Sequence, residues 1–423
     1  MATSLMNNFK NKMSKLKDPN AGNTAEFDVL YSTGFLSIDY LNGTVVHVES
    51  EDRNFNYHAT GIVDGSTNTI IGRSGSGKST LMMQIIGNIM RPFIEKYNEN
   101  GDIKACIYID DLESSLPFAR KEFLIGIPRE KWEECVDMRN TGITAENIYK
   151  RIYAIYTDKL SNKASYTYDT GLYDTNGDRI FKLIPTLYAI DSIPQIMPEN
   201  IIEDEDLGGG MDASAVAKTN TFLFKKISQL CKASNIVLFT INHILDEIST
   251  GFIPKAAQIS GLKQGERLPG GKAALYLANN MFRVDDSITL KPDKDYGIDG
   301  SVITFTIIKS RTNTSKKSVP LIFNKTTGEF DKELSLYHLL KEQGRINGAG
   351  VSQYLADCPD VKFSTKTFKK VLGESLELQE AFAKECFNIL STYLSETRKA
   401  NLDANAVSDN IANMFNKFMT LES

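Results

Sequence analysis

A glycine-rich stretch of the chain has residue types and spacing that suit phosphate binding. From Gly72 to Ser79 it reads Gly-Arg-Ser-Gly-Ser-Gly-Lys-Ser, matches G-x-x-x-x-G-K-[ST] at every position, follows an apolar run and precedes a helical pattern. Glycines allow consecutive backbone N–H groups to converge on phosphate oxygens, and the following helix adds the positive end of its dipole. We expect Lys78 to reach the terminal phosphates of ATP and Ser79 to bind Mg²⁺. The predicted nucleotide-binding loop comprises Gly72, Arg73, Ser74, Gly75, Ser76, Gly77, Lys78, Ser79 and Thr80.

Carboxylates at the ends of two apolar runs complete this predicted site. Asp191 follows one such run, and we expect it to hold Mg²⁺ together with Ser79. Hydrolysis of a nucleotide also requires a group that orients or deprotonates water, and Asp110, Asp111 and Glu113 end another run. The alternation and end point of that strand decide which of the three faces the phosphates. The sequence leaves all three open.

The elements that must position these residues alternate between short β-branched runs and longer helical stretches. This alternation is typical of an α/β fold in which helices flank a mostly parallel central sheet. The predicted strands are 68–71, 105–109, 186–190, 236–241, 280–284 and 302–308. The predicted helices are 78–97, 145–156 and 214–233.

The first 28 residues are predicted to form a short N-terminal helical arm and a linker. Apolar side chains recur there at spacings of three and four, at Leu5, Met6, Phe9, Met13 and Leu16. Helix-breaking residues at 18–23 separate this helix from the rest of the chain, so it has no adjacent partner in sequence. We expect the arm to dock on another subunit, and a frayed terminus is the alternative.

Two further regions differ from the α/β pattern. Residues 161–182 are polar and contain Asn176-Gly177, a pair that favours a tight turn, so they predict an inserted hairpin. Beyond residue 331 the β-branched runs stop and helical periodicity continues. The helices predicted there are 335–343, 365–371, 381–398 and 407–420. The chain therefore divides into an arm at 1–28, a core at 29–330 and a helical C-terminal domain at 331–423.

Composition and charge exclude several classes of protein. The chain has 423 residues, of which 41% are hydrophobic and 24% charged, and this excludes a wholly disordered or collagen-like chain. A net charge of −5 gives the whole molecule no attraction for polyanions, so any contact with nucleic acid must be local. Five cysteines without a Cys-x-x-Cys pair and only four histidines indicate neither a zinc site nor a disulfide framework. We recognise no signal peptide or membrane span and expect a cytoplasmic location.

The order of these elements resembles the core of the RecA recombinases. The segment from Ser32 to Asp39 resembles the one that this family places before its phosphate loop. The strand ending in Asn242-His243 resembles the strand leading into the family's second DNA-binding loop, with His where bacterial RecA has Gln and UvsX-type phage recombinases have His. Lys309-Ser310-Arg311-Thr312 resembles the same tetrapeptide of UvsX-type proteins. The resemblance covers about residues 32–330 and is closest to the UvsX-type phage recombinases.

This resemblance implies a RecA-like P-loop ATPase core and a catalytic glutamate within residues 110–113. Two ways of aligning the family's glutamate with this sequence disagree. Counting back from Pro117 reaches Leu112, and counting back from Arg120 reaches Asp111. Glu113 is the preferred candidate because it is the only Glu in the segment.

The resemblance assigns three more residues to the nucleotide. Phe118 approximately matches the aromatic side chain that stacks on adenine, with a buried packing residue as the alternative. Lys309 and Arg311 lie where the family contacts the nucleotide of the neighbouring subunit, and this makes them, with Lys78 and Glu113, the predicted catalytic residues.

A predicted mobile loop at 244–277 is the main candidate for DNA binding. Between Phe252 and Lys272 it has four basic residues against one acidic residue, and Phe252 is expected to lie against bases while the cations meet phosphates. A merely solvated loop is the alternative. The family's first DNA loop would fall near residues 207–211, although an acidic run at 203–206 precedes it. The predicted DNA-binding residues are Gly209, Met211, His243, Phe252, Lys255, Lys263, Arg267, Gly270 and Gly271.

Together with the glycine-rich loop, the resemblance implies an ATP-dependent DNA strand-exchange recombinase that forms helical filaments on single-stranded DNA. Its expected partners are single-stranded DNA, homologous duplex DNA, further copies of the chain, recombination mediators and single-strand-binding proteins. The expected location is the bacterial cytoplasm, with a phage as a possible source. One alternative is a ring-forming replicative helicase with the same core. The other is a DNA-binding homologue that has lost hydrolysis.

Overall fold

The structure is a computed structural model that describes most of the chain between residues 29 and 394. The described ranges are 29–50, 53–98, 102–114, 116–174, 177–203, 212–246, 261–270 and 276–394. Several sequence predictions lie outside them, namely the helical arm, the helix at 407–420 and five DNA-binding candidates. Those five candidates are Gly209, Met211, Phe252, Lys255 and Gly271.

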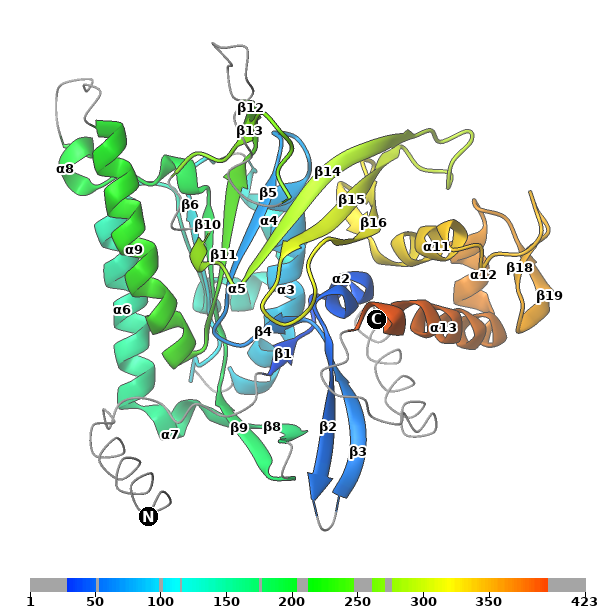
Figure 1. Cartoon of the computed structure of the whole chain (residues 1–423), viewed down its shortest axis with the longest axis horizontal. Coiled ribbons are helices and arrows are strands. Elements are labelled where there is room, and N and C mark those ends of the chain that lie inside the picture. The colour runs from blue at the N-terminus through cyan, green and yellow to red at the C-terminus, as the bar shows by residue number, and fades with distance from the viewer. Residues whose placement is uncertain are drawn as a thin grey trace, which may run out of the picture.

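A nine-stranded sheet forms the centre of the molecule (Figure 1). Its strand order is β17-β16-β15-β14-β5-β11-β10-β6-β7, in which the six strands from β14 to β7 are parallel and the other three are antiparallel. The parallel strands are β5 (Thr67–Gly72), β6 (Ile107–Asp111), β7 (Val136–Arg139), β10 (Thr186–Asp191), β11 (Ile236–His243) and β14 (Asn280–Leu290). The antiparallel strands are β15 (Gly300–Lys309), β16 (Lys317–Asn324) and β17 (Glu329–Asp331). The prediction of a large, mostly parallel sheet is confirmed.

Helices cover both faces of this sheet, which explains why its central strands are buried on both sides. β5 and β10 are buried along their whole length. On β10, Leu187 and Ala189 belong to the apolar cluster of α3, whereas Tyr188 and Ile190 belong to that of α6 and α9. Strands buried on both faces tend to be rich in apolar residues, and each of the six predicted strands overlaps a strand of this sheet, whereas β7, β16 and β17 were not predicted.

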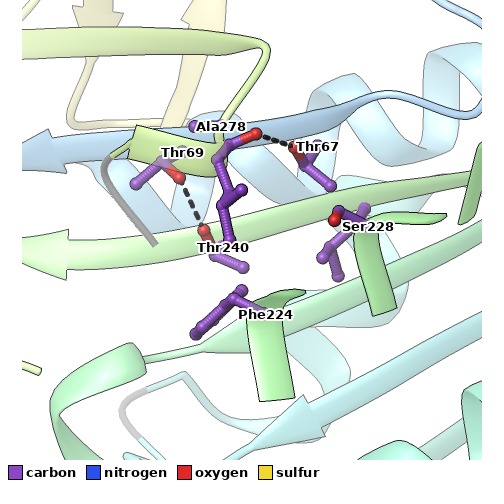
Figure 2. A pocket seen from close by; sticks show the side chains of 8 residues that line it. Thr67, Thr69, Phe224, Ser228, Thr240 and Ala278 are labelled. Carbon is purple, nitrogen blue, oxygen red and sulfur yellow. Dashed lines mark hydrogen bonds between the residues drawn. The ribbon is translucent and has the colours of Figure 1, made fainter. Parts of the chain in front are cut away.

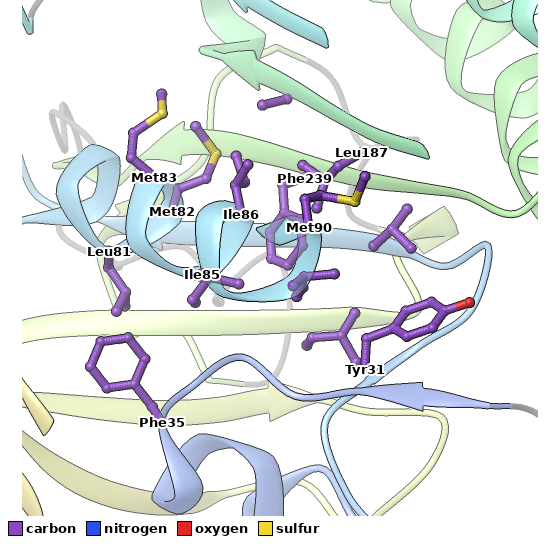
Figure 3. Close-up of a cluster of buried hydrophobic side chains, with 14 of the residues drawn as sticks. Tyr31, Phe35, Leu81, Met82, Met83, Ile85, Ile86, Met90, Leu187 and Phe239 are labelled. Atoms are coloured by element: carbon purple, nitrogen blue, oxygen red, sulfur yellow. The ribbon is translucent and has the colours of Figure 1, made fainter. Parts of the chain in front are cut away.

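One face is covered by α3 (Lys78–Tyr97), α4 (Phe118–Ile125) and α5 (Arg129–Cys135), and the other by α6 (Ala145–Ser161) and α9 (Asp212–Ser234). Figure 3 shows side chains of α3, among them Ile86 and Met90, against Leu187 and Phe239 of the sheet. Gly87 is required where α3 meets α4, because a Cβ atom there would lie 2.0 Å from the carbonyl oxygen of Ile125. The three predicted helices are present.

Small two-stranded sheets surround the central one. They are formed by β1 (Leu30–Tyr31) with β4 (Ile62–Val63), β2 (Thr44–Ser50) with β3 (Arg53–Ala59), β8 (Thr167–Tyr173) with β9 (Arg179–Leu183), and β12 (Leu245–Asp246) with β13 (Glu266–Arg267). The inserted hairpin predicted at 161–182 is therefore present as β8 and β9. The short helices α2 (Leu36–Leu41), α7 (Lys163–Tyr166) and α8 (Glu199–Ile202) complete this part.

The C-terminal region combines helices with a hairpin that the helical prediction missed. It contains α11 (Lys332–Glu342), β18 (Gln353–Leu355), β19 (Cys358–Phe363), α12 (Phe368–Glu374) and α13 (Leu376–Leu390). Neither strand of the hairpin has an apolar run, so its sequence gives no strand signal. Leu336 and Phe382 of this region share an apolar cluster with Val302 and Ile322 of the central sheet, so the C-terminal region packs directly on that sheet.

Membrane-spanning helices were also sought among the described residues. None of the helices there has the length and apolar character needed to cross a bilayer.

Candidate functional site

The carboxyl ends of four neighbouring parallel strands bring the candidate residues together. His243 of β11 pairs with Gly72 of β5, and Asp191 of β10 pairs with Asp111 of β6. Since parallel strands end at one edge of a sheet, residues far apart in sequence meet there. This edge carries the loop between β5 and α3, Asp191, and the segment after β6 that contains Glu113.

The loop between β5 and α3 depends on glycines at two positions. Gly75 and Gly77 have φ angles of 77° and 84°, in the left-handed region that favours glycine. Lys78 begins α3, and its Nζ donates a 2.7 Å hydrogen bond to the carbonyl oxygen of Arg73 within the same loop. Burial lowers the pKa of Lys78. The loop thus directs a largely buried ammonium group at its own backbone.

Ser79 and Asp191 form a pair beside this loop. Oγ of Ser79 donates a 2.7 Å hydrogen bond to Oδ2 of Asp191. Burial raises the pKa of Asp191 to about 6. Oδ1 of Asp191 and Oγ of Ser76 are buried and have no hydrogen-bond partner among the described residues. Unpaired buried polar atoms are costly, and those beside this loop suit a bound metal or phosphate group.

Glu113 lies next to this pair and accepts two hydrogen bonds. Its Oε1 accepts one from Oγ of Ser192 and one from Nε2 of His243, the latter at 2.6 Å. The backbone N–H of Glu113 donates to the carbonyl oxygen of Asp191 at 3.1 Å. Partial burial opposes ionisation of Glu113, but the bonds from Ser192 and His243 and the charge of Lys78 lower its pKa below the ordinary value. Glu113 is therefore held as a carboxylate.

Asp110 and Asp111, the other two candidates for the catalytic carboxylate, are engaged elsewhere. Asp110 pairs with Arg151 of α6 and accepts a hydrogen bond from Tyr188. Asp111 pairs with the buried Lys121 of α4 and accepts a 2.9 Å bond from the backbone of residue 114. Of the three carboxylates, only that of Glu113 contacts Ser192 and His243.

Phe118 lies at the start of α4 and is partly exposed. Its ring packs edge-on against Trp132 at 5.4 Å, and the Arg129 guanidinium lies 4.8 Å from its centroid. The adjacent Arg120 donates a 2.9 Å hydrogen bond to the carbonyl oxygen of Thr327, so this end of α4 contacts the turn between β16 and β17. Phe118 has both a packing partner and an accessible surface.

Lys309 lies at the end of β15, two strands from β5 in the central sheet, and Arg311 follows two residues later. Lys309 ends β15 opposite Met281, which in turn is level with Thr69, three residues before Gly72. Its Nζ donates a 2.6 Å hydrogen bond to the carbonyl oxygen of Tyr276, and burial lowers its pKa to about 8. Arg311 is exposed. Lys309 is thus level with Thr69 of β5 and contacts Tyr276 rather than the glycine-rich loop.

Four of the predicted DNA-binding residues are described. His243 contacts Glu113, as above, whereas Lys263 and Arg267 are exposed. Gly270 packs against Ile193, and a Cβ atom at residue 270 would lie 2.6 Å from Cγ2 of that side chain. The base of the predicted loop is thus anchored beside the candidate site.

The structure adds residues that the sequence interpretation had not assigned. Ser192, Lys121 and Arg151 each hold one of the candidate carboxylates. Only Ser192 had a sequence signal, as the direct neighbour of Asp191. The two cations lie on helices whose tertiary contacts the sequence does not reveal.

Two cavities differ in their fit to a nucleotide. A hollow of about 350 Å³ lies beside the glycine-rich loop, lined by Arg73, Ser74, Gly75, Ser76, Lys263, Val284 and Asp285. The other, of about 10 Å³, lies between the sheet and α9, where Thr69 and Thr240 are joined by a 2.9 Å hydrogen bond (Figure 2). The second has room for about one water molecule. Only the first is large enough for part of a nucleotide.

Neither a cluster of metal-binding side chains among the described residues nor a known relative assigns a further role to residues of this site. Within the described ranges, no group of three histidine, cysteine or carboxylate side chains is arranged to hold a metal ion. No family model matches the chain, and no curated protein matches it either.

Proposed function

We propose that the chain is an ATP-dependent DNA strand-exchange recombinase of the RecA type, similar to the UvsX-type phage recombinases, and that it forms filaments on single-stranded DNA. The observation that carries this proposal is the convergence of the glycine-rich loop, the Ser79–Asp191 pair and Glu113 at one edge of a parallel sheet. Ligands of open parallel sheets bind at the carboxyl ends of the strands, which is where these residues lie.

In this proposal the loop of residues 72–80 binds the phosphates of ATP. Its exposed backbone and the start of α3 supply N–H groups, and Lys78 turns from the carbonyl oxygen of Arg73 to the phosphates. The unpaired hydroxyl of Ser76 is a further donor. Phe118, at the exposed start of α4, is proposed to contact the adenine ring.

Ser79 and Asp191 would hold Mg²⁺, since Oδ1 of Asp191 is buried and has no partner among the described residues. Magnesium keeps several waters and takes its remaining ligands from one or two protein oxygens and from phosphates, so a site of two protein residues is sufficient. When bound, the ion neutralises phosphate charge.

Glu113 is the proposed residue that orients and deprotonates water. Ser192 and His243 fix its carboxylate and favour its ionised form, which is the form able to accept a proton. His243 ends the strand that leads to the proposed DNA-binding loop, so the same contact connects that loop to the proposed catalytic carboxylate.

Lys309 and Arg311 are proposed to act on the nucleotide of a neighbouring subunit. The position of Lys309 supports this, because the residue is level with Thr69 of β5 and not with the loop that follows Gly72. A head-to-tail contact of this kind generates a filament when it does not close and a ring when it does.

The test is the rate of ATP hydrolysis with and without single-stranded DNA, with the Lys78→Ala variant as the control. We expect DNA to increase turnover in the wild type and the variant to be inactive at both conditions. Electron microscopy of the same sample with ATP and DNA should show helical filaments. Closed rings would favour the helicase alternative, and ATP binding without turnover would favour a homologue that has lost hydrolysis.

A further inference from the structure

A two-stranded stem formed by β12 and β13 lies against the glycine-rich loop. In the antiparallel register of the two strands, Leu245 lies opposite Arg267 and Asp246 lies opposite Glu266. The residue between β11 and β12, Ile244, donates its backbone N–H to the carbonyl oxygen of Gly72 at 3.0 Å. Figure 1 shows this stem at the edge where β5 ends. Residues 245–246 and 266–267 are thus placed within reach of the loop.

The β13 half of the stem is fixed by a buried ion pair. Arg283 of β14 donates two hydrogen bonds to the carboxylate of Glu266, at 2.6 and 2.9 Å, and both side chains are 4% exposed. The backbone N–H of Lys263 adds a third bond to Glu266 at 2.7 Å. Separating a buried pair leaves an uncompensated charge, so this half should stay in place when the loop changes.

The β12 half is joined to the loop by an exposed ion pair. Arg73, the second residue of the loop, donates bonds of 2.9 and 2.6 Å to the two carboxylate oxygens of Asp246. The side chains are 54% and 70% exposed. Exposed pairs of this kind are weak and exchange readily, so a stronger acceptor near Arg73 would displace Asp246.

A triphosphate on the loop is such an acceptor. It requires the ammonium of Lys78, which now donates to the carbonyl oxygen of Arg73, and it brings several negative charges to the loop that carries the Arg73 guanidinium. Guanidinium groups bind phosphate as well as carboxylate through paired hydrogen bonds. The contact of the Arg73 guanidinium with Asp246 and that of its carbonyl oxygen with Lys78 therefore both compete with a bound triphosphate, whereas Glu266 lies farther from the guanidinium, at 3.9 Å.

We propose that Arg73 exchanges Asp246 for the terminal phosphate of a bound nucleoside triphosphate, and that release of Asp246 transmits occupancy of the loop to the stem. This inference rests on the proposed function, because it requires the loop to bind a nucleotide. It does not require the stem to bind DNA. By linkage, whatever favours release of Asp246 must also favour ATP binding.

The test is a double-mutant cycle on ATP affinity, measured by calorimetry on the full chain without DNA. Asp246→Asn removes the competitor of the phosphate and should tighten ATP binding about two- to fivefold. Arg73→Gln should weaken it, and Asp246→Asn should have no effect in that background. ADP lacks the terminal phosphate, so its affinity should not respond to Asp246→Asn.

A matched control removes another exposed ion pair. Asp357→Asn breaks the 2.6 Å contact with Lys384 in the C-terminal region and should leave ATP affinity unchanged. Amide hydrogen exchange gives a second readout, because ATP but not ADP should speed exchange at residues 245–246 in the wild type and not in Arg73→Gln.

The outcomes separate the two proposals. If Asp246→Asn tightens ATP binding equally in the wild type and in Arg73→Gln, the effect is a general one of charge, and the proposed exchange is overturned. Unchanged ATP affinity in Asp246→Asn, beside measurable binding by the wild type, would overturn it as well while leaving the proposed function intact. Absence of ATP binding by the wild type would overturn both.

Discussion

Nε2 of His243 lies 2.6 Å from Oε1 of Glu113 and joins the end of β11 to the segment that follows β6. These residues are 130 positions apart in sequence. Oγ of Ser192 donates to the same carboxylate oxygen. The charge state and orientation of Glu113 are therefore controlled from two neighbouring strands at once.

The first prediction concerns the pH dependence of ATP hydrolysis. His243→Ala removes a donor to the ionised carboxylate of Glu113, so the pKa of Glu113 should rise from its lowered value. In the proposed mechanism, ATP hydrolysis requires ionised Glu113, so we expect the rate to fall as pH falls through the pKa of Glu113. The acidic fall in kcat/KM should therefore occur at higher pH in His243→Ala than in the wild type. His243→Gln, which retains an N–H donor, should shift it less. If kcat/KM falls at the same acidic pH in all three proteins, His243 does not influence the ionisation of Glu113.

The second prediction concerns the stability of the ligand-free protein. Burial raises the pKa of Asp191 from 3.8 to about 6, so the folded state binds this proton more tightly than the unfolded state. The free energy of unfolding therefore falls as pH rises from about 4 to about 6. Above pH 6 the buried charge of Asp191 destabilises the fold to its full extent. Asp191→Asn removes the charge and should increase the free energy of unfolding at pH 7 by up to about 3 kcal/mol.

Urea unfolding at two pH values checks this. The gain from Asp191→Asn should be present at pH 7 and largely absent at pH 4, where the carboxyl group is protonated in the folded wild type and about half protonated in the unfolded state. A variant less stable than the wild type at pH 7 would contradict the assignment. Hydrolysis should be lost in the variant, so stability and activity change in opposite directions.

The third prediction separates chemistry from folding at Lys78. Lys78→Ala should abolish ATP hydrolysis and ATP-dependent filament formation, because no ammonium remains to neutralise the β- and γ-phosphates. Nζ of Lys78 donates only to the carbonyl oxygen of Arg73 among the described hydrogen bonds, so the midpoint of thermal unfolding should change by only a few degrees. Wild-type turnover by the folded variant would contradict the ATPase assignment.

The middle of the central sheet could be predicted from sequence because strands such as β5 and β10 are buried on both faces. β5 and β10 are buried along their whole length, and both strands were predicted to within about one residue. The hairpin of β2 and β3 was missed because residues 53–59 read Arg-Asn-Phe-Asn-Tyr-His-Ala, in which polar residues interrupt any apolar run. The β18–β19 hairpin was missed for the same reason.

The candidate site was predictable in its parts rather than in its arrangement. Sequence reasoning could not choose among Asp110, Asp111 and Glu113, because the choice depends on where β6 ends and on partners that come from other elements. Arg151 and Lys121, which pair with the two aspartates, lie 41 and 10 residues further along the chain. Nothing in their local sequence marks them as partners of this strand.

The fourth prediction tests action between subunits. Arg311→Ala should leave ATP affinity of the isolated subunit nearly unchanged and reduce DNA-stimulated hydrolysis, and Lys309→Ala should behave in the same way. Mixing Arg311→Ala with Lys78→Ala should restore part of the activity, because at some interfaces an intact loop meets an intact cation. If the two proteins are shown to co-assemble and still no activity returns, the cations do not act on a neighbouring subunit.

The last prediction concerns the stem and single-stranded DNA. Lys263 and Arg267 are exposed cations at the base of the loop predicted to bind DNA. If both contact phosphate, replacing both with Ala should weaken DNA binding and lower the slope of log K against log salt by about 0.7 per contact, or about 1.4 in total. Lys370→Ala removes a cation that is 76% exposed on α12 and serves as the control, with no expected change in slope.

The same titrations distinguish phosphate contact from base stacking. Phe252→Ala should weaken binding by about 1–3 kcal/mol if the ring stacks on a base, without changing the salt slope. Lys255→Ala should reduce the slope by about 0.7, like each of the other two cations. Basal ATP hydrolysis should stay near the wild-type rate in Phe252→Ala and Lys255→Ala. Titrations of the Lys263→Ala/Arg267→Ala protein that overlay those of the wild type at every salt concentration would show that the stem is only solvated, and the DNA contact would then have to lie on another surface.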